Sequence, residues 1–309
     1  MDKEDITSFE DFINNFRSHK KGDITLFRGQ EENFSLLPKI ARDSPSKNTA
    51  KIEREMLDEL RRRGNLYLNG NHDDWDLLVL AQHYGMATRL LDWTTNPLIA
   101  LWFSFQGAKA TKSTYVYAFL PPDENFLDKT KDIDPFKPTK TKVFKPTLNN
   151  ERIIAQNGWF TAHRYSNRTG SFVSLEDNKE LKEWIIEFKI PPKIREDMIA
   201  KLDVLGINSQ SVYPGLEGVC NHINWINDFL ESCKKLVVFY YHRAIGEMLE
   251  KECKNYVVVK GGMKPKDKDK AMNNFQDDPK IKLFIGQITA SCEGLDLFAA
   301  DTVAFLEFG

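Results

Sequence analysis

The chain has 309 residues, of which 41% are hydrophobic and 28% charged, and its formal net charge is −2. This length gives room for about two globular domains. The nearly neutral balance excludes a chain-wide attraction to nucleic acid or to an anionic membrane. The sequence holds no apolar run of the roughly 18 residues that suggest a membrane-spanning helix, and it opens on an acidic segment. We therefore expect a cytoplasmic protein.

Cysteine and histidine are too scattered to suggest a metal site. The four cysteines are widely and irregularly spaced, with no CxxC pair, at Cys220, Cys233, Cys253 and Cys292. The six histidines form no HExxH motif. Zinc needs clustered ligands, and disulfides need an oxidising compartment. We therefore predict buried, reduced thiols and no metal.

The first 220 residues predict helices and strands in an irregular order. Apolar residues at helical spacing predict helices over residues 5–19, 50–63, 73–85, 97–107 and 192–205. Runs rich in β-branched and aromatic residues predict strands over residues 23–27, 114–120, 159–163 and 184–190. Residues 123–150 are rich in Lys, Pro, Asp and Thr, which predicts a long surface excursion. This order favours an α+β domain over residues 1–222.

After Asn221 the pattern changes to regular alternation. An amphipathic helix is predicted over residues 222–233, followed by short apolar strands at 235–240, 256–259, 282–285 and 302–307. Helices over residues 244–252 and 266–275 lie between them. Short apolar strands that alternate with helices are typical of a parallel α/β sheet buried on both faces. We predict a second domain over residues 223–309.

Three stretches of this second domain carry a family resemblance. They are KKLVVFYYHRAIGEML, VVVKGGMKPKDKDKAMNNFQDDP and KLFIGQITASCEGLDLFAADTVAFLEF, in that order. Together they resemble the second RecA-like lobe of superfamily-two helicases, from about Ile223 to Gly309. The resemblance implies that a loop with Ser291, Glu293 and Gly294 contacts a nucleic-acid backbone. The alternative is that Gly294 only serves a turn.

Missing motifs limit what this lobe can do. The sequence has no GxxxxGK[ST] loop and no Asp-Glu box after a strand, and it stops before the arginine-containing motif VI of the resembled lobe. We therefore expect an incomplete, truncated RecA-like lobe that does not hydrolyse ATP or unwind nucleic acid alone. The basic residues from Lys260 to Lys270 alternate with Asp267 and Asp269. They indicate a solvated helix start and at most a weak nucleic-acid contact.

The first domain also carries a resemblance. Phe27-Arg28-Gly29-Gln30, the block of residues 74–105, RIIAQNGWFTAH and GINSQSVYPGLEGV resemble the FRG domain, over about residues 8–220. Ala87 stands where that family usually has proline. The resemblance implies a domain of the kind found in bacterial or phage conflict systems.

One short stretch of this domain concentrates polar and aromatic side chains. It lies between two apolar helices and contains Gln82, His83, Tyr84, Arg89, Asp92, Trp93, Thr94, Thr95 and Asn96. A loop-like stretch of this density is more often a site than a connector. Arg89 and Asp92 could instead pair to stiffen a turn. Arg28 could be a phosphate fork or part of a buried salt bridge, and a lone His163 is more often packed than catalytic.

The arrangement is similar in outline to ADP-ribosyltransferase folds, which bind NAD. The similarity assigns Arg28 and Gly29 to the pyrophosphate, Trp93-Thr94-Thr95 to the middle strand, and residues 100–103 to the helix that follows. Glu217, or alternatively Asp92, takes the role of the late acid that stabilises developing positive charge. Candidate catalytic residues are thus Arg28, Asp92 and Glu217. Candidate cofactor-binding residues are Gly29, Gln82, His83, Tyr84, Arg89, Trp93, Thr94 and Thr95.

Three hypotheses follow from the sequence. The first is a nucleotide-handling, NAD-consuming domain that acts on an unknown protein target or a small molecule. The second is a non-catalytic module that binds protein or nucleic acid. The third is a fragment of a helicase-related fusion.

Overall fold

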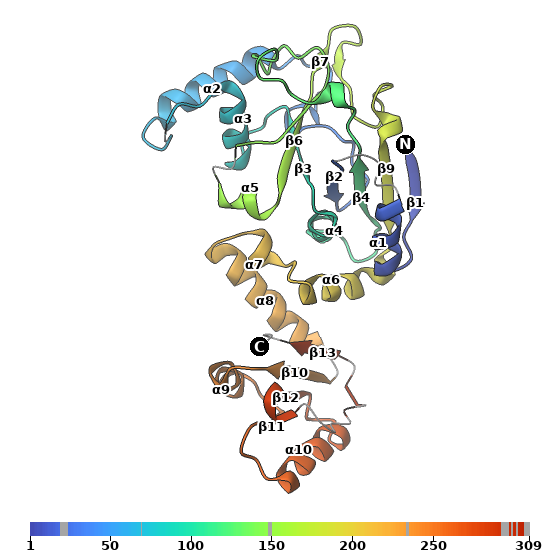
Figure 1. The fold of residues 1–309 in the computed structure, drawn as a ribbon, viewed down its shortest axis with the longest axis vertical. Helices are drawn as coiled ribbons and strands as arrows, with labels where there is room; N and C mark the ends of the chain where they lie inside the picture. Colours follow the sequence, from blue (N-terminus) through green and yellow to red (C-terminus); the bar gives the residue numbers. More distant parts are fainter. Residues whose placement is uncertain are drawn as a thin grey trace. The chain divides into compact units, whose positions relative to one another are not determined.

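The computed structural model describes residues 1–18, 24–68, 70–147, 150–232, 235–291, 297, 299–300 and 302–305. The chain forms two compact units, Met1–Gly218 and Val219–Gly309. Helix α8 (Leu216–Ser232) begins in the first unit and continues into the second, so the domain junction predicted near residue 222 lies inside a helix. Figure 1 labels most of the elements in both units.

The first unit is built on a mixed sheet of seven strands. Their spatial order is β1 (Asp2–Asp5), β9 (Ile185–Ile190), β4 (Thr114–Phe119), β2 (Leu26–Gln30), β3 (Leu90–Thr94), β6 (Gly158–Ala162) and β5 (Lys142–Phe144). Strand β1 runs parallel to β9, and every other pair of neighbours in this sheet is antiparallel. A separate small hairpin consists of β7 (Tyr165–Ser166) and β8 (Ser171–Phe172). The fold is therefore mixed α/β with a largely antiparallel sheet.

Helices pack against this sheet, mainly on one of its faces. They are α1 (Phe9–Ser18), α2 (Ala50–Gly64), α3 (Asp74–His83), α4 (Pro97–Phe105), α5 (Glu151–Ala155), α6 (Arg195–Val204) and α7 (Ser209–Val212), with 3₁₀ turns η1 (Lys39–Ala41), η2 (Asp123–Asn125), η3 (Lys182–Trp184) and η4 (Pro192–Ile194). Apolar side chains of α1, α4 and α6 share one core cluster with β2, β4 and β9. Asn96 caps α4 by accepting a hydrogen bond from the Leu98 amide, and Pro97 occupies the first turn, as predicted.

The sheet is nearly open between β2 and β3. These strands share a single register pair, Phe27 with Thr94, whereas β2 pairs with β4 over the whole of Leu26–Gln30 and β3 pairs with β6 over the whole of Leu90–Thr94. Two well-paired halves of the sheet therefore meet at one point and diverge beyond it.

Helix α4 packs directly on the backbone of β2. A Cβ atom at Gly29 would lie 1.9 Å from the carbonyl oxygen of Ala100 and 2.5 Å from the amide nitrogen of Ser104. Glycine is thus required here because the helix approaches the strand too closely for any side chain. The three residues of the Phe-Arg-Gly motif have different roles. Phe27 packs in the core, Arg28 lines a cavity, and Gly29 leaves room for helix α4.

Two sequence predictions need correction. The polar stretch expected to be loop-like contains β3, an inner strand whose Leu91 and Trp93 are buried while Asp92 between them is exposed, and the middle strand assigned to residues 93–95 begins earlier and ends at Thr94. The predicted surface excursion over residues 123–150 contributes Phe136, Val143 and Phe144 to the core. Both errors arose because the abundant polar residues masked a small number of buried apolar ones.

The second unit has a four-stranded sheet whose strands are all parallel. The spatial order is β11 (Tyr256–Val259), β12 (Leu283–Gln287), β10 (Leu236–Tyr240) and β13 (Thr302–Phe305). The helices α9 (Arg243–Glu252), α10 (Pro265–Asp277) and α11 (Ile288–Ser291) alternate with them. Separate apolar clusters occupy the two faces of the sheet. The predicted parallel α/β lobe is confirmed.

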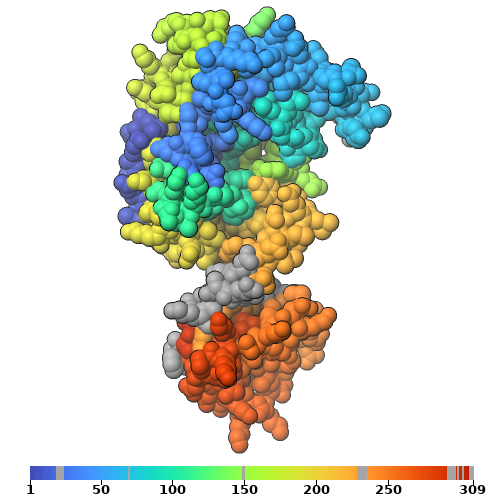
Figure 2. All heavy atoms as spheres, turned by 180° about the vertical axis from the view of Figure 1, so that it is seen from behind, coloured from blue at the N-terminus to red at the C-terminus, as the bar shows by residue number. Residues whose placement is uncertain are grey.

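The far end of α2 projects from the surface of the first unit, as the light-blue segment in Figure 2 shows. Leu66 and Tyr67 in the turn that follows are 88% and 84% exposed. None of the described helices has both the length and the apolar character that crossing a bilayer requires. In the same residues, no three side chains of His, Cys, Asp or Glu gather as they would around a metal ion.

Candidate functional site

A cavity of about 410 Å³ lies where β2 and β3 diverge. Its walls come from both strands, the end of α3, the 3₁₀ turn η1, and the α5–β6 segment. Seven of the residues predicted for a site line it: Arg28, Gly29, Gln82, His83, Asp92, Trp93 and Thr94. The volume is within the range that small-molecule sites occupy.

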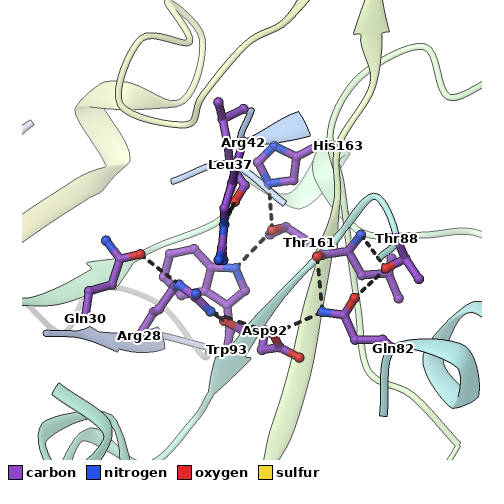
Figure 3. A network of polar contacts seen from close by, with 11 residues as sticks. Arg28, Gln30, Leu37, Arg42, Gln82, Thr88, Asp92, Trp93, Thr161 and His163 are labelled. Carbon is purple, nitrogen blue, oxygen red and sulfur yellow. Dashed lines mark hydrogen bonds and ion pairs between the residues drawn. The ribbon is translucent and has the colours of Figure 1, made fainter. Parts of the chain in front are cut away.

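Arg28 reaches from β2 across to β3. Its Nη1 donates to the backbone oxygen of Asp92 at 2.8 Å and lies 3.9 Å from the Asp92 carboxylate, as Figure 3 shows. Its Nε donates to Gln30 Oε1 at 3.4 Å. Only 15% of the side chain is exposed, and this burial lowers the pKa of Arg28 to about 10, while Asp92 opposes the shift and the like charge of Arg42 adds to it. Arg28 is therefore charged at neutral pH and held in a fixed direction.

The Asp92 carboxylate is oriented by Gln82. The Gln82 amide donates to Asp92 Oδ2 at 3.0 Å and to the Leu90 carbonyl at 3.2 Å, and its own oxygen accepts from the Thr88 hydroxyl. All three contacts fix the rotation of the amide (Figure 3). The Asp92 side chain is nonetheless 60% exposed, so its carboxylate remains accessible to a ligand.

Trp93 is held by a short polar chain behind the cavity. Its indole nitrogen donates to the Thr161 hydroxyl at 3.0 Å, and that hydroxyl lies 3.1 Å from Nε2 of His163. His163 is completely buried, and this burial, helped by the charges of Arg28 and Arg89, lowers its pKa to about 3. It is therefore a neutral, packed histidine that supports the tryptophan, in agreement with the more common role of an isolated histidine.

Three further cations line the cavity, and the sequence alone did not single them out as site residues. Lys39 Nζ donates to the Gly85 carbonyl at 3.3 Å, Arg42 Nε donates to the Leu37 carbonyl at 3.2 Å, and the Arg152 guanidinium lies 4.4 Å above the ring of Tyr213. Within the described part of the chain, none of the three has a carboxylate at salt-bridge distance. Asp92 is the one acidic residue of the lining. The cavity thus has excess positive charge.

Arg89 lies outside the cavity, in the core. Its guanidinium donates to both carboxylate oxygens of Glu53 on α2, at 3.1 and 2.7 Å, and to the Pro135 carbonyl at 3.1 Å. The two side chains are 1% and 2% exposed. Arg89, expected to bind a cofactor, therefore does not line the cavity, and the alternative that it pairs with Asp92 does not hold either, because Arg89 is bound to Glu53 and Asp92 faces Arg28. Apart from its place in a predicted helix, no sequence pattern identifies Glu53 as the partner of Arg89.

The remaining predicted residues are spread around the site. His83 lines the cavity, its Nε2 lies 3.0 Å from the Asn150 amide, and burial together with the charge of Arg152 lowers its pKa. Tyr84 is 76% exposed, and Thr95 is also exposed. Glu217 lies on the first turn of α8, exposed and outside the lining, although its charge helps to raise the pKa of Tyr213.

In the second unit, Ser291 is the last residue of α11, and Glu293 and Gly294 lie outside the described residues. In the basic segment after β11, two of the lysines make contacts within this unit. Lys260 Nζ pairs with Glu250 at 2.7 Å, and Lys268 Nζ donates to the Ala290 carbonyl at 2.7 Å.

Comparisons with known proteins identify both parts of the chain. Residues 23–113 match the FRG domain family, and residues 221–308 match the helicase conserved C-terminal domain family. No curated protein matches the chain.

Two solved structures are similar to part of the chain. The C-terminal part of the Fun30 ATPase domain shares 19% identity over 38% of this chain and 44% of its own, with a TM-score of 0.26. The Sulfolobus solfataricus SWI2/SNF2 ATPase C-terminal domain shares 23% identity over 36% of this chain and 55% of its own, with a TM-score of 0.25. The chain thus spans about half the length of each structure. It carries an FRG domain at residues 23–113 and a helicase conserved C-terminal domain at residues 221–308.

Proposed function

We propose that the FRG-containing unit binds an NAD-type dinucleotide in the cavity between β2 and β3 and acts on its ribosyl bond. The observation that carries this proposal is the composition of one cavity: four cationic side chains, one accessible carboxylate and aromatic walls. Phosphates require the cations, a ribose or its developing charge suits the carboxylate, and a flat base suits aromatic faces.

Arg28 and Arg42 are the residues best suited to hold a pyrophosphate. Arg28 is already oriented by the Asp92 carbonyl, and Arg42 is close enough for its charge to lower the pKa of Arg28. Two like charges kept together raise the energy of the free protein, and a bound dianion would relieve this repulsion. Gly29 supports the proposal by letting α4 close the wall beside Arg28.

The carboxylate suited to the reaction is Asp92. When the bond between ribose and nicotinamide breaks, its electron pair leaves with nicotinamide, and positive charge develops on the ribose carbon. Asp92, aimed by Gln82, would stabilise that charge. The acceptor, water or a target side chain, then forms the new bond and loses its proton to solvent. Glu217 is less suited, because it is exposed on α8 and outside the cavity lining.

The likeness to ADP-ribosyltransferase folds remains part of this proposal. The order of features supports it: Arg28 on one strand, Asp92, Trp93 and Thr94 on the adjacent strand, and α4 directly after it. The helicase-type lobe is proposed to have no ATPase activity by itself, because the sequence lacks the phosphate-binding GxxxxGK[ST] loop.

Calorimetric titration of the whole chain with NAD at concentrations up to the millimolar range tests the binding. We expect saturable binding that is lost in Arg28→Ala and weakened in Arg42→Gln, while Arg63→Gln on the exposed face of α2 binds as the wild type does. Arg42→Gln keeps the test valid if Arg28→Ala fails to fold. Absence of NAD binding by the folded wild type would overturn the proposal.

A non-catalytic binding module is the alternative that the same cavity allows. Release of nicotinamide, followed by chromatography, separates the two. Turnover that falls at least tenfold in Asp92→Asn, with NAD binding retained, supports catalysis by the carboxylate. Saturable binding with no nicotinamide release by the wild type would favour the binding module.

A further inference from the structure

We propose that Arg152 and Tyr213 form a second anion subsite in the same cavity, so that the preferred ligand is a dinucleotide with a third phosphate on its ribose, of the NADP type. This inference rests on the proposed function and specifies its ligand. Its starting point is the position of Arg152, which lies on a different wall from Arg28 and Arg42.

The two cationic groups flank β3 from opposite sides. Arg28 is on β2 and Arg42 follows η1, whereas Arg152 is on α5, directly before β6, and the sheet order is β2–β3–β6. Electrostatics divide the groups in the same way, since Arg42 perturbs Arg28 and Arg152 perturbs His83. A pyrophosphate bound by Arg28 and Arg42 would leave Arg152 without a counter-charge.

Arg152 is half-buried, and among the described residues no carboxylate lies at salt-bridge distance from it. Burial and the charge of Arg152 both lower the pKa of His83 beside it, so the positive charge of Arg152 acts within the cavity. A half-buried guanidinium without an acidic partner costs solvation energy unless an anion arrives. Because Arg152 lines the cavity, the ligand bound there would supply that anion.

Tyr213 prepares the guanidinium for bidentate binding. The centre of its ring lies 4.4 Å from Arg152 Cζ, a cation–π contact that holds the guanidinium, whose five N–H donors can also serve a phosphate. The segment that carries Tyr213 is fixed to the cavity wall, because Gln156 Nε2 donates to the Val212 carbonyl at 3.2 Å. The fork is therefore positioned before any ligand binds.

The test compares the affinities of NAD and NADP for the whole chain by calorimetry, in wild type, Arg152→Gln and Arg152→Lys. We expect the wild type to bind NADP at least about tenfold more tightly than NAD, as one charge-assisted bidentate contact allows. Arg152→Gln should bind the two dinucleotides with equal affinity, because the contact that distinguishes them is removed. Arg152→Lys should keep part of the preference, because it keeps the charge without the fork. Tyr213→Leu should reduce the preference and Tyr213→Phe should preserve it.

Each result decides one question. Equal affinities for NAD and NADP in the wild type overturn the second subsite and leave the proposed function intact. Tighter binding of a dinucleotide with a carboxylate on its pyridine ring than of NADP overturns the assignment to a ribose phosphate. An Arg152→Gln variant that loses both ligands to the same extent would place Arg152 in the general binding site instead. If neither dinucleotide binds, the proposed function itself fails.

Discussion

At the scale of single residues, the two arginines of the sequence pattern have opposite roles. Arg28 is aimed into a cavity and its nearest carboxylate is accessible, whereas Arg89 is enclosed with Glu53 in the core. Residue type and spacing could not separate these roles, because the partner of Arg89 lies on α2, far away in the sequence. The difference depends on tertiary packing, which brings α2 against β3.

The Arg89–Glu53 pair predicts a large loss of stability when one partner is removed. Glu53→Gln leaves a buried guanidinium without its counter-charge, which should lower the free energy of unfolding by about 3–5 kcal/mol. Urea unfolding followed by tryptophan fluorescence measures this, since five of the six tryptophans lie within residues 1–218. Glu59→Gln is the matched control, because Glu59 forms only exposed pairs on α2 and should cost less than about 1 kcal/mol. Equal effects of the two changes would contradict the assignment.

His163 predicts that stability falls as the pH is lowered. Its pKa in the folded chain is about 3, below the ordinary value of 6.5, so the unfolded chain binds more protons between these values. The stabilisation is therefore complete above pH 6.5 and is lost progressively toward pH 3, with a slope approaching about 1.4 kcal/mol per pH unit. Unfolding of wild type and His163→Gln should be compared at pH 6 and pH 5, where few carboxylates titrate. The same slope for both proteins would show that His163 does not cause it.

At the scale of elements, the sequence predicted most helices and strands, but it did not predict where β2 and β3 diverge. Apolar periodicity located α2, α3, α4 and the strands of the second unit, because each buries one face or both. It could not show that β2 and β3 share only the pair of Phe27 and Thr94, since strand pairing is not written in local periodicity. The places of Lys39 and Arg42 could not be predicted for the same reason, because only the tertiary fold brings η1 to the cavity.

Gly29 predicts a test of how α4 and β2 fit together. In Gly29→Ala the new Cβ would overlap the Ala100 carbonyl, so the helix must shift, at a cost of about 1–3 kcal/mol or more. The same shift should weaken NAD binding, because α4 and β2 both line the cavity. Gly64→Ala at the end of α2 has its nearest neighbour at 3.4 Å and should be neutral or slightly stabilising. Thermal unfolding and calorimetry of both variants check this, and an unchanged Gly29→Ala protein would refute the close approach.

At the scale of the whole molecule, the chain joins an FRG domain to a helicase-type lobe, and all the residues proposed for the ligand lie in the first unit. The ligand should therefore stabilise that unit specifically. At a free NAD concentration about 100 times the dissociation constant, the unfolding transition reported by tryptophan should gain about 2.7 kcal/mol. Hydrogen exchange at β10, β11 and β12 should stay unchanged. Protection of those strands by NAD would place a nucleotide site in the second unit instead.

The single register pair between β2 and β3 also has an evolutionary consequence. Because each half of the sheet keeps its own complete ladder, the opening between them can widen or narrow without breaking other strand pairs. The shape of the opening that receives a ligand can therefore change without a change in the stability of either half of the sheet. Changes in the long connection from β2 to β3, which carries η1, α2 and α3, can retune the ligand that is accepted while the scaffold is inherited intact.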